Sequence, residues 1–130
     1  GIDKPVHIGE TGWATLSDGL YGDTGSAATD EYKSALYYQL MREWTNANGI
    51  TCFYFEAFDE KWKDALNPQG SENHFGLFNL QAEAKFALWG LVDAGVFEGL
   101  TRDGKPITKS FAGDTTALIR VVKVPPSRPL

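Results

Sequence analysis

A strand, a long loop, an amphipathic helix and a second strand follow one another over the first 58 residues. This order constrains the fold more than any other feature of the chain. The segment KPVHIGE, residues 4–10, predicts a short strand, and ITCFYFEAF, residues 50–58, is β-branched or aromatic on both faces up to Glu56. Strands that are apolar on both faces are typical of parallel sheets covered by helices. The sequence therefore predicts a βαβ unit and an α/β fold.

The helix between the two strands is predicted from its ends and from its apolar spacing. Thr29 is the expected N-cap, and Gly49 is the expected C′ residue. Between them, Leu36, Leu40 and Trp44 recur at intervals of four residues. This spacing predicts an apolar face, and we expect that face to be buried in the core.

Three further segments carry a secondary-structure signal. Residues 81–96, QAEAKFALWGLVDAGV, predict a second helix with Trp89 in the core, and the Asp103-Gly104 pair predicts a turn. The run TALIRVVKV, residues 116–124, favours a strand. A strand formed by this run could cover an open sheet edge, either within this chain or by exchange between chains.

Length and composition limit the classes of protein that are possible. The 130 residues suffice for one domain with a modest core, and we assign residues 1–96 to the main unit and 97–130 to a tail with a turn and one β-prone segment. A net charge of −5 argues against a nucleic-acid partner, and no apolar run reaches the roughly 18 residues of a membrane span. Cys52 is the only cysteine, and His-rich ligand spacing is missing, so we expect no metal and no cofactor.

Acidic residues stand where both predicted strands end. Glu10 ends the first strand, while Glu56 and Glu60 lie at the end of the second, and Trp13 and Trp62 flank these positions. The carboxyl ends of neighbouring parallel strands meet at one edge of a sheet, where α/β folds bind ligands. Paired carboxylates there suit glycoside hydrolysis, in which one protonates the leaving oxygen and the other attacks or activates water. On the residues alone, a solvent-facing strand end stays an open alternative for Glu10.

Three separated motifs then point to a known family. GETGW at 9–13, FYFEAFDEKWK at 53–63 and ENHFGLF at 72–78 resemble, in order and spacing, the end of glycoside hydrolase family 17, and most closely its bacterial branch. The family comprises β-1,3-glucanases and related β-glucan transferases with a (β/α)8 TIM barrel. The resemblance, which covers residues 4 to about 90, implies that residues 1–96 are the C-terminal part of such a barrel, strands seven and eight with the helices that follow.

The resemblance also implies roles for individual residues. Glu10 matches the catalytic nucleophile, whose attack would form a glycosyl-enzyme that water or another sugar resolves. A charged cluster that supports the nucleophile is matched by Glu60, Lys63 and Glu72. We expect Glu56 to be either a second acid of the cleft or a structural, hydrogen-bonded group. The expected substrate-binding residues are Trp13, Trp62, Phe75 and Glu56.

The general acid of the family, a glutamate preceded by asparagine on barrel strand four, has no counterpart in this sequence. We therefore expect the acid to lie outside this chain and the isolated chain to be inactive or nearly so. Two strands cannot close a barrel. Either this sequence is a fragment of a longer chain, or another copy or another subunit supplies the missing strands, by self-association or strand exchange. The chain begins with glycine and not methionine, and we expect this N-terminus not to be a natural start.

The expected partner is a β-glucan oligosaccharide or polysaccharide. The resemblance suggests an extracellular, periplasmic or membrane-associated bacterial enzyme, although this chain has no membrane segment of its own. Two alternatives to a hydrolase stay open. One is a β-1,3-glucanosyltransferase, which shares the glycosyl-enzyme intermediate. The other is a non-catalytic glucan-binding or structural half-barrel fragment.

Overall fold

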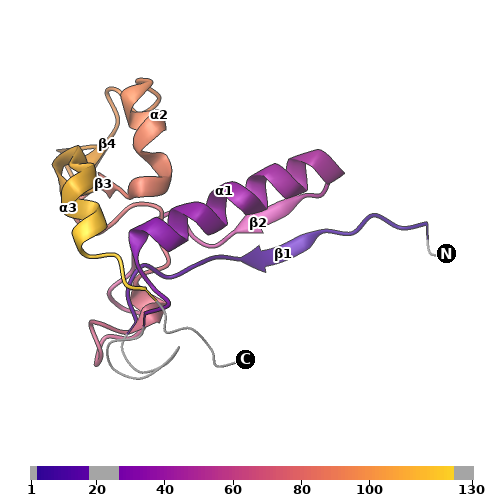
Figure 1. Cartoon of the computed structure of the whole chain (residues 1–130), viewed down its shortest axis with the longest axis horizontal. Coiled ribbons are helices and arrows are strands. Elements are labelled where there is room, and N and C mark those ends of the chain that lie inside the picture. Colours follow the sequence, from indigo (N-terminus) through magenta and orange to yellow (C-terminus); the bar gives the residue numbers. More distant parts are fainter. Residues whose placement is uncertain (1–2, 18–26, 125–130) are drawn as a thin grey trace.

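The computed structural model describes residues 3–17 and 27–124 of the chain, and Figure 1 shows how their helices and strands are arranged. The elements are, in chain order, β1 (Ile8–Thr11), α1 (Glu31–Asn48), β2 (Cys52–Tyr54), the 3₁₀ turn η1 (Ser71–Asn73), β3 (Glu83–Ala84), η2 (Phe86–Leu88), α2 (Trp89–Asp93), β4 (Thr101–Arg102), β5 (Lys105–Pro106), β6 (Thr108–Lys109), η3 (Ser110–Gly113) and α3 (Thr115–Arg120).

The predicted βαβ unit is confirmed. β1 and β2 pair in parallel, with Ile8 opposite Cys52 and Thr11 opposite Tyr54, and α1 runs alongside both strands in Figure 1. The strands are shorter than the sequence predicts, and the register shifts between the two paired positions. The expectation that β2 is buried on both faces is wrong, because 64% of Phe53 is exposed.

The start of α1 differs from the prediction by one residue. Asp30, in extended conformation, is the N-cap, and its carboxylate accepts the N–H of Lys33 at 2.8 Å. Thr29 therefore lies just before the cap. At the other end the prediction is confirmed, because Gly49 adopts a left-handed conformation with φ of 61° and its N–H closes the last turn.

The apolar face predicted to be buried on α1 is exposed. Leu36, Leu40 and Trp44 are 49%, 54% and 51% exposed. The helix instead turns Tyr37 toward the sheet, where its ring centroid lies 6.5 Å from that of Tyr54. The regular spacing identified a genuine helix, but the described residues provide no second layer to cover its leucine side.

Residues 81–96 do not form one helix, contrary to the prediction. The side chain of Asn79 accepts the N–H groups of Gln81 and Glu83, at 2.9 and 3.0 Å, and Ala82 has a positive φ of 62°. This turn delivers the chain into β3, which pairs in parallel with β6. Helical structure begins only afterwards, with η2 and α2.

The C-terminal region contains a hairpin and a helix. β4 and β5 are joined by Asp103 and Gly104 with φ of 51° and 76°, which confirms the predicted turn. The predicted strand that follows is wrong, since α3 occupies this position. Its cap explains the difference: the carboxylate of Asp114 accepts the N–H of Thr116 at 2.9 Å, and Leu118 of this helix is almost fully buried.

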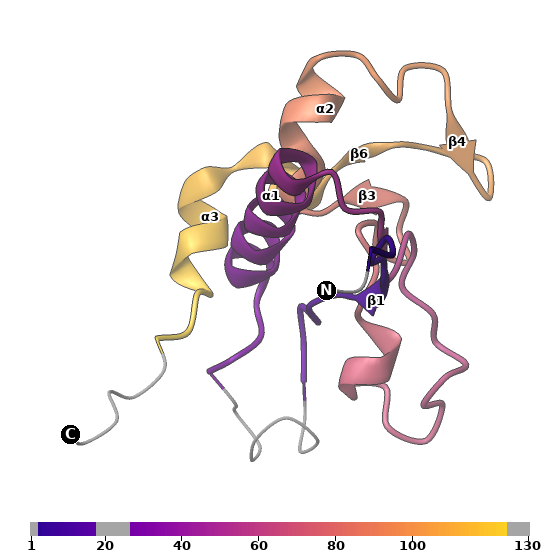
Figure 2. The same cartoon turned by 90° about the vertical axis from the view of Figure 1, so that its right-hand side faces the viewer.

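One buried cluster lies near the N-terminal end of α1. Figure 2 views α1 from its C-terminal end, with α2 above the helix and α3 beside it. Ser110 donates to Glu31 at 2.6 Å, and the indole of the buried Trp89 donates to Ser110 at 3.1 Å. The region after residue 97 thus contributes to the same core as α1. The buried apolar residues are Ala14, Ala82, Ala84, Leu88, Trp89 and Leu118.

No helix in the described ranges is long and apolar enough to cross a membrane.

Candidate active site

The ends of β1 and β2 come together closely. The N–H of Phe55 donates to the carbonyl of Thr11 at 2.6 Å. A Cβ at Gly12 would overlap the carbonyl oxygen of Phe55, so a residue with a side chain does not fit there without a shift. Glu10 is exposed on β1, and Glu56 follows β2 across a cis peptide bond. Both glutamates therefore lie on segments that the strand pair holds side by side.

Glu56 and Lys63 form an ion pair beyond the end of β2. The ammonium nitrogen of Lys63 lies 3.0 and 3.1 Å from the two carboxylate oxygens, and both side chains are largely buried. Burial raises the pKa of Glu56 above its ordinary value, Lys63 opposes this, and the carboxylates of Glu60 and Asp59 raise it further. Lys63, assigned by sequence to the support of Glu10, thus has Glu56 as its carboxylate partner in this structure.

The two remaining acids of the predicted cluster lie on neighbouring segments. The N–H of Glu60 donates to the carbonyl of Asn73 at 3.2 Å, and Glu72 precedes Asn73 in η1. Both glutamates are partly buried. The structure therefore brings their backbones together, while support of Glu10 by these carboxylates stays a prediction.

Aromatic side chains surround Lys63. The rings of Phe55 and Phe75 lie 5.7 Å apart between centroids, and the Lys63 ammonium lies 3.9 Å from the centroid of Phe55. Trp62 is 5.9 Å from the same ammonium and is 70% exposed. An exposed indole beside a charged pair offers a flat apolar face to a solute, as sugar-binding sites require.

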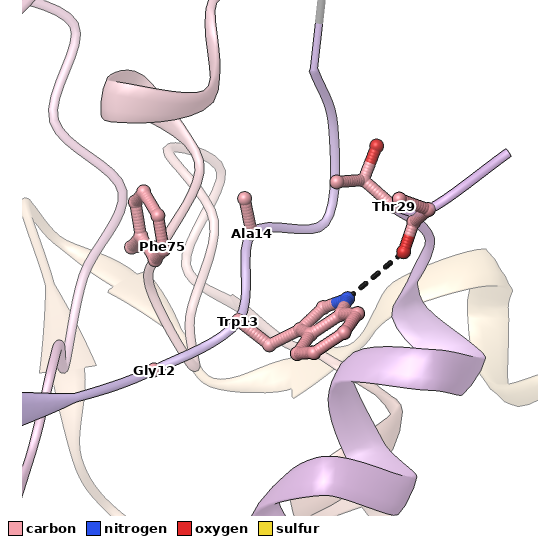
Figure 3. A pocket seen from close by; sticks show the side chains of 6 residues that line it. Gly12, Trp13, Ala14, Thr29 and Phe75 are labelled. Carbon is pink, nitrogen blue, oxygen red and sulfur yellow. Dashed lines mark hydrogen bonds between the residues drawn. The ribbon is translucent and has the colours of Figure 1, made fainter. Parts of the chain in front are cut away.

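Trp13 and Phe75 border one apolar cavity of about 340 Å³ (Figure 3). The indole N–H of Trp13 donates to the carbonyl of Ala28 at 2.9 Å, and its ring lies 5.2 Å from that of Tyr37. Figure 3 shows Phe75 on the other side of the backbone that carries Gly12 and Ala14. Two of the predicted substrate-binding aromatics therefore share a cavity. Its lining residues are Gly12, Trp13, Ala14, Ala28, Thr29 and Phe75.

A buried ion pair close to this cavity was not predicted from the sequence. Lys85 and Asp59 lie 2.7 Å apart, and each side chain is only 5% exposed. Lys85 falls within the helix predicted for residues 81–96, and no motif joins it to Asp59, which is 26 residues away. The one available signal was Asp59 itself, an acid next to Glu60 in the second motif. His74, also absent from the predicted site, lies close to Asp59, with 3.6 Å between Nδ1 and Oδ2.

The side chains at these strand ends suit carboxylate chemistry. Glu10 is accessible to a solute, and a carboxylate can attack a carbon or accept a proton. Among residues 3–17 and 27–124, no group of three or more His, Cys, Asp and Glu side chains is arranged to hold a metal ion.

A parallel βαβ unit with carboxylates at its strand ends and aromatic side chains beside them is an arrangement that the class of α/β glycosidases uses. Within that class, the sequence model of glycosyl hydrolases family 17 matches residues 3–89, and the chain belongs to this family. The family folds as a TIM barrel, and this chain covers part of one.

Individual relatives agree with the family. The chain is similar to the solved structure of an endo-laminarinase from Formosa, with a TM-score of 0.94 and 61% identity over 99% of this chain and 33% of that one. It is 37% identical to a glucan 1,3-beta-glucosidase of Arthroderma benhamiae, over 66% of this chain and 28% of the relative. A glucan 1,3-beta-glucosidase of Saccharomyces cerevisiae is 35% identical, over 66% of this chain and 26% of the relative. The chain thus spans about a third or less of the length of these proteins.

Proposed function

We propose that this chain supplies the nucleophile and one wall of the cleft of a retaining glycosidase that acts on β-1,3-glucan. The observation that carries the proposal is the 61% identity to an endo-laminarinase across almost the whole chain. The position of the exposed Glu10 on the strand that leads into the Trp13–Phe75 cavity supports it further.

In the proposed mechanism, the carboxylate of Glu10 attacks the anomeric carbon and displaces the aglycone oxygen, which takes a proton from a general acid. The covalent glycosyl-enzyme is then hydrolysed by water, which the same acid, now a base, deprotonates. Two displacements at one carbon retain its configuration. Trp13 and Phe75 hold the glucan rings by apolar contact while these steps take place.

We further propose that β1 and β2 are strands seven and eight of the barrel. The general acid then belongs to strand four, outside the residues of this chain. In the complete cleft, a retaining mechanism requires the two carboxyl groups to be about 5–5.5 Å apart. Glu10 is exposed, so its carboxylate is accessible from outside this chain.

Covalent trapping tests the nucleophile directly. An enzyme that contains this chain together with the remaining barrel strands is incubated with a dinitrophenyl 2-deoxy-2-fluoro-β-laminaribioside, and its peptides are analysed by mass spectrometry. We expect the fluorosugar on Glu10, no label in Glu10→Gln, and a loss of turnover on the order of a thousandfold or more in that variant with oligosaccharide binding preserved. Glu98→Gln, at an exposed turn, is the matched control. A label on another carboxylate would overturn the assignment.

A further inference from the structure

The ammonium group of Lys85 is buried and fully provided with acceptors. Its nitrogen lies 2.7 Å from a carboxylate oxygen of Asp59, 2.8 Å from the hydroxyl of Thr15 and 3.4 Å from the carbonyl of His74. A lysine has three N–H donors, so each donor has one partner here. Burial lowers the pKa of Lys85, and the negative charge of Asp59 opposes that effect.

Two of these partners hold each other as well. The backbone N–H of Thr15 donates to the carbonyl of His74 at 3.0 Å, and the Thr15 hydroxyl donates to the same carbonyl at 3.2 Å. Thr15 follows Trp13 by two residues, and His74 immediately precedes Phe75. Lys85 therefore fastens together the two segments that border the aromatic cavity.

The third partner fixes the other side of Phe75. Asp59 accepts the N–H of Gly76 at 2.8 Å with the same oxygen that contacts the lysine. Nearby, the N–H of Asp59 donates to Phe78 at 2.9 Å, and the N–H of Glu56 donates to the carbonyl of Phe75 at 3.1 Å. Both neighbours of Phe75 are thus held by groups bonded to Lys85.

We infer that Lys85 and Asp59 are positioning residues, which hold Trp13, Glu56 and Phe75 in the arrangement that a glucan chain requires. The inference rests on the proposed function. Replacing a buried ion pair by uncharged side chains often costs little stability, whereas removing one partner alone is strongly destabilising. We therefore do not explain the buried Lys85–Asp59 pair by stability alone. The hydrogen bonds of the pair to three separate segments explain its presence.

The experiment compares two double variants of the full 130-residue chain. Lys85→Met/Asp59→Asn removes the buried charges and keeps an acceptor for the Gly76 amide. Lys109→Met/Asp93→Asn makes the same changes at an ion pair of the same 2.7 Å length, in which the side chains are 28% and 62% exposed. Lys85→Met alone, which leaves a buried carboxylate unpaired, serves as the destabilised reference.

Three measurements are made on each variant: the melting temperature, the hydrogen exchange of the Thr15 amide and the Kd for laminarihexaose. We expect Lys85→Met to lower the melting temperature by roughly 10 °C or more, and the Lys85/Asp59 double variant to recover at least half of this loss. Despite that recovery, Thr15 should exchange about tenfold faster or more, and Kd should rise about tenfold. The Lys109/Asp93 variant should match the wild type in all three.

If the recovered double variant binds laminarihexaose and exchanges at Thr15 like the wild type, the pair is only structural and the inference is wrong. If the wild-type chain itself does not bind laminarihexaose, the proposal that this chain binds glucan is wrong. In that case the Thr15 exchange still decides whether Lys85 positions the two loops.

Discussion

Single residues of the site depend on contacts that their own neighbours in the sequence do not reveal. The sequence identified Glu10, Trp13 and Phe75 because they lie in recognisable motifs, and the structure places Trp13 and Phe75 at one cavity. It did not identify Lys85, because the hydroxyl that Lys85 contacts is 70 residues away. The ion pair of Lys63 with Glu56 was not predicted either, since motif spacing does not reveal which of several nearby acids accepts an ion pair.

The close approach at Gly12 leads to a prediction about stability. In Gly12→Ala the new methyl group overlaps the carbonyl of Phe55, so we expect the free energy of unfolding to fall by about 1–3 kcal/mol. Gly9→Ala, in the strand that immediately precedes Gly12 and with open space around it, should change the value by less than about 0.5 kcal/mol. Chemical denaturation of both variants checks this, and equal effects would contradict the close contact.

A second prediction concerns the carboxyl group of Glu31, which accepts from Ser110 and from the N–H of Phe86. Burial raises its pKa above the ordinary 4.5 in spite of these bonds. Well below pH 4.5 the group is protonated in both the folded and the unfolded state. As pH rises through the folded-state pKa, the unfolded chain ionises more readily, so the stability that the neutral group provides is lost.

Denaturation curves of the wild type and of Glu31→Gln between pH 4 and pH 8 test this direction. The wild type should lose stability relative to the variant as pH rises, because glutamine stays neutral throughout. A difference that is independent of pH, or one that changes in the opposite sense, would show that Glu31 does not have a raised pKa.

Helices and strands were predicted well where local signals agree with long-range packing. Gly49 ends α1 as expected, and Asp103-Gly104 forms its turn. The other elements depend on partners that a periodic pattern does not contain. The pairing of β3 with β6 removes residues 81–85 from the predicted helix, and the Asp114 cap turns a β-prone run into α3. In both places a specific hydrogen-bonding arrangement outweighs intrinsic propensity.

The exposed leucine side of α1 gives a prediction for this element. Leu40→Gln should change the free energy of unfolding of the chain by less than about 0.5 kcal/mol, because the side chain is already half in solvent. Leu118→Ala in α3 should cost about 2–5 kcal/mol, because that side chain is almost completely buried. Thermal or chemical unfolding separates the two. A large loss in Leu40→Gln would mean that this face is covered in solution, for example by a second copy.

At the scale of the whole molecule, several large apolar side chains of the βαβ unit are exposed. Phe53 on the sheet and Leu36, Leu40 and Trp44 on α1 are each about half exposed or more, and within the described residues the β1–β2 pair has no further strand beside it. Since the chain spans a third of the endo-laminarinase it resembles, this surface fits the proposed place of the unit within a barrel. Self-association or strand exchange stays a prediction.

The same proposal predicts that the 130-residue chain does not hydrolyse glucan by itself. The purified 130-residue chain should release no reducing ends from laminarin above the buffer background, because the proposal places the general acid for the leaving oxygen on a strand outside these residues. A complete family member at equal molar concentration provides the positive control. Turnover by the chain alone would show that another of its own carboxylates serves as the acid.

The bond between Ser110 and Glu31 also has a consequence for biosynthesis. Its two ends are 79 residues apart, and they join the first turn of α1 to a segment translated much later. While the ribosome is still adding those residues, the carboxyl group at the start of the helix lacks this donor, and the indole of Trp89 lacks its contact with the serine hydroxyl. The surroundings of α1 are therefore complete only after Ser110 has been synthesised, so the packing of this end of the helix depends on residues that are translated well after the helix itself.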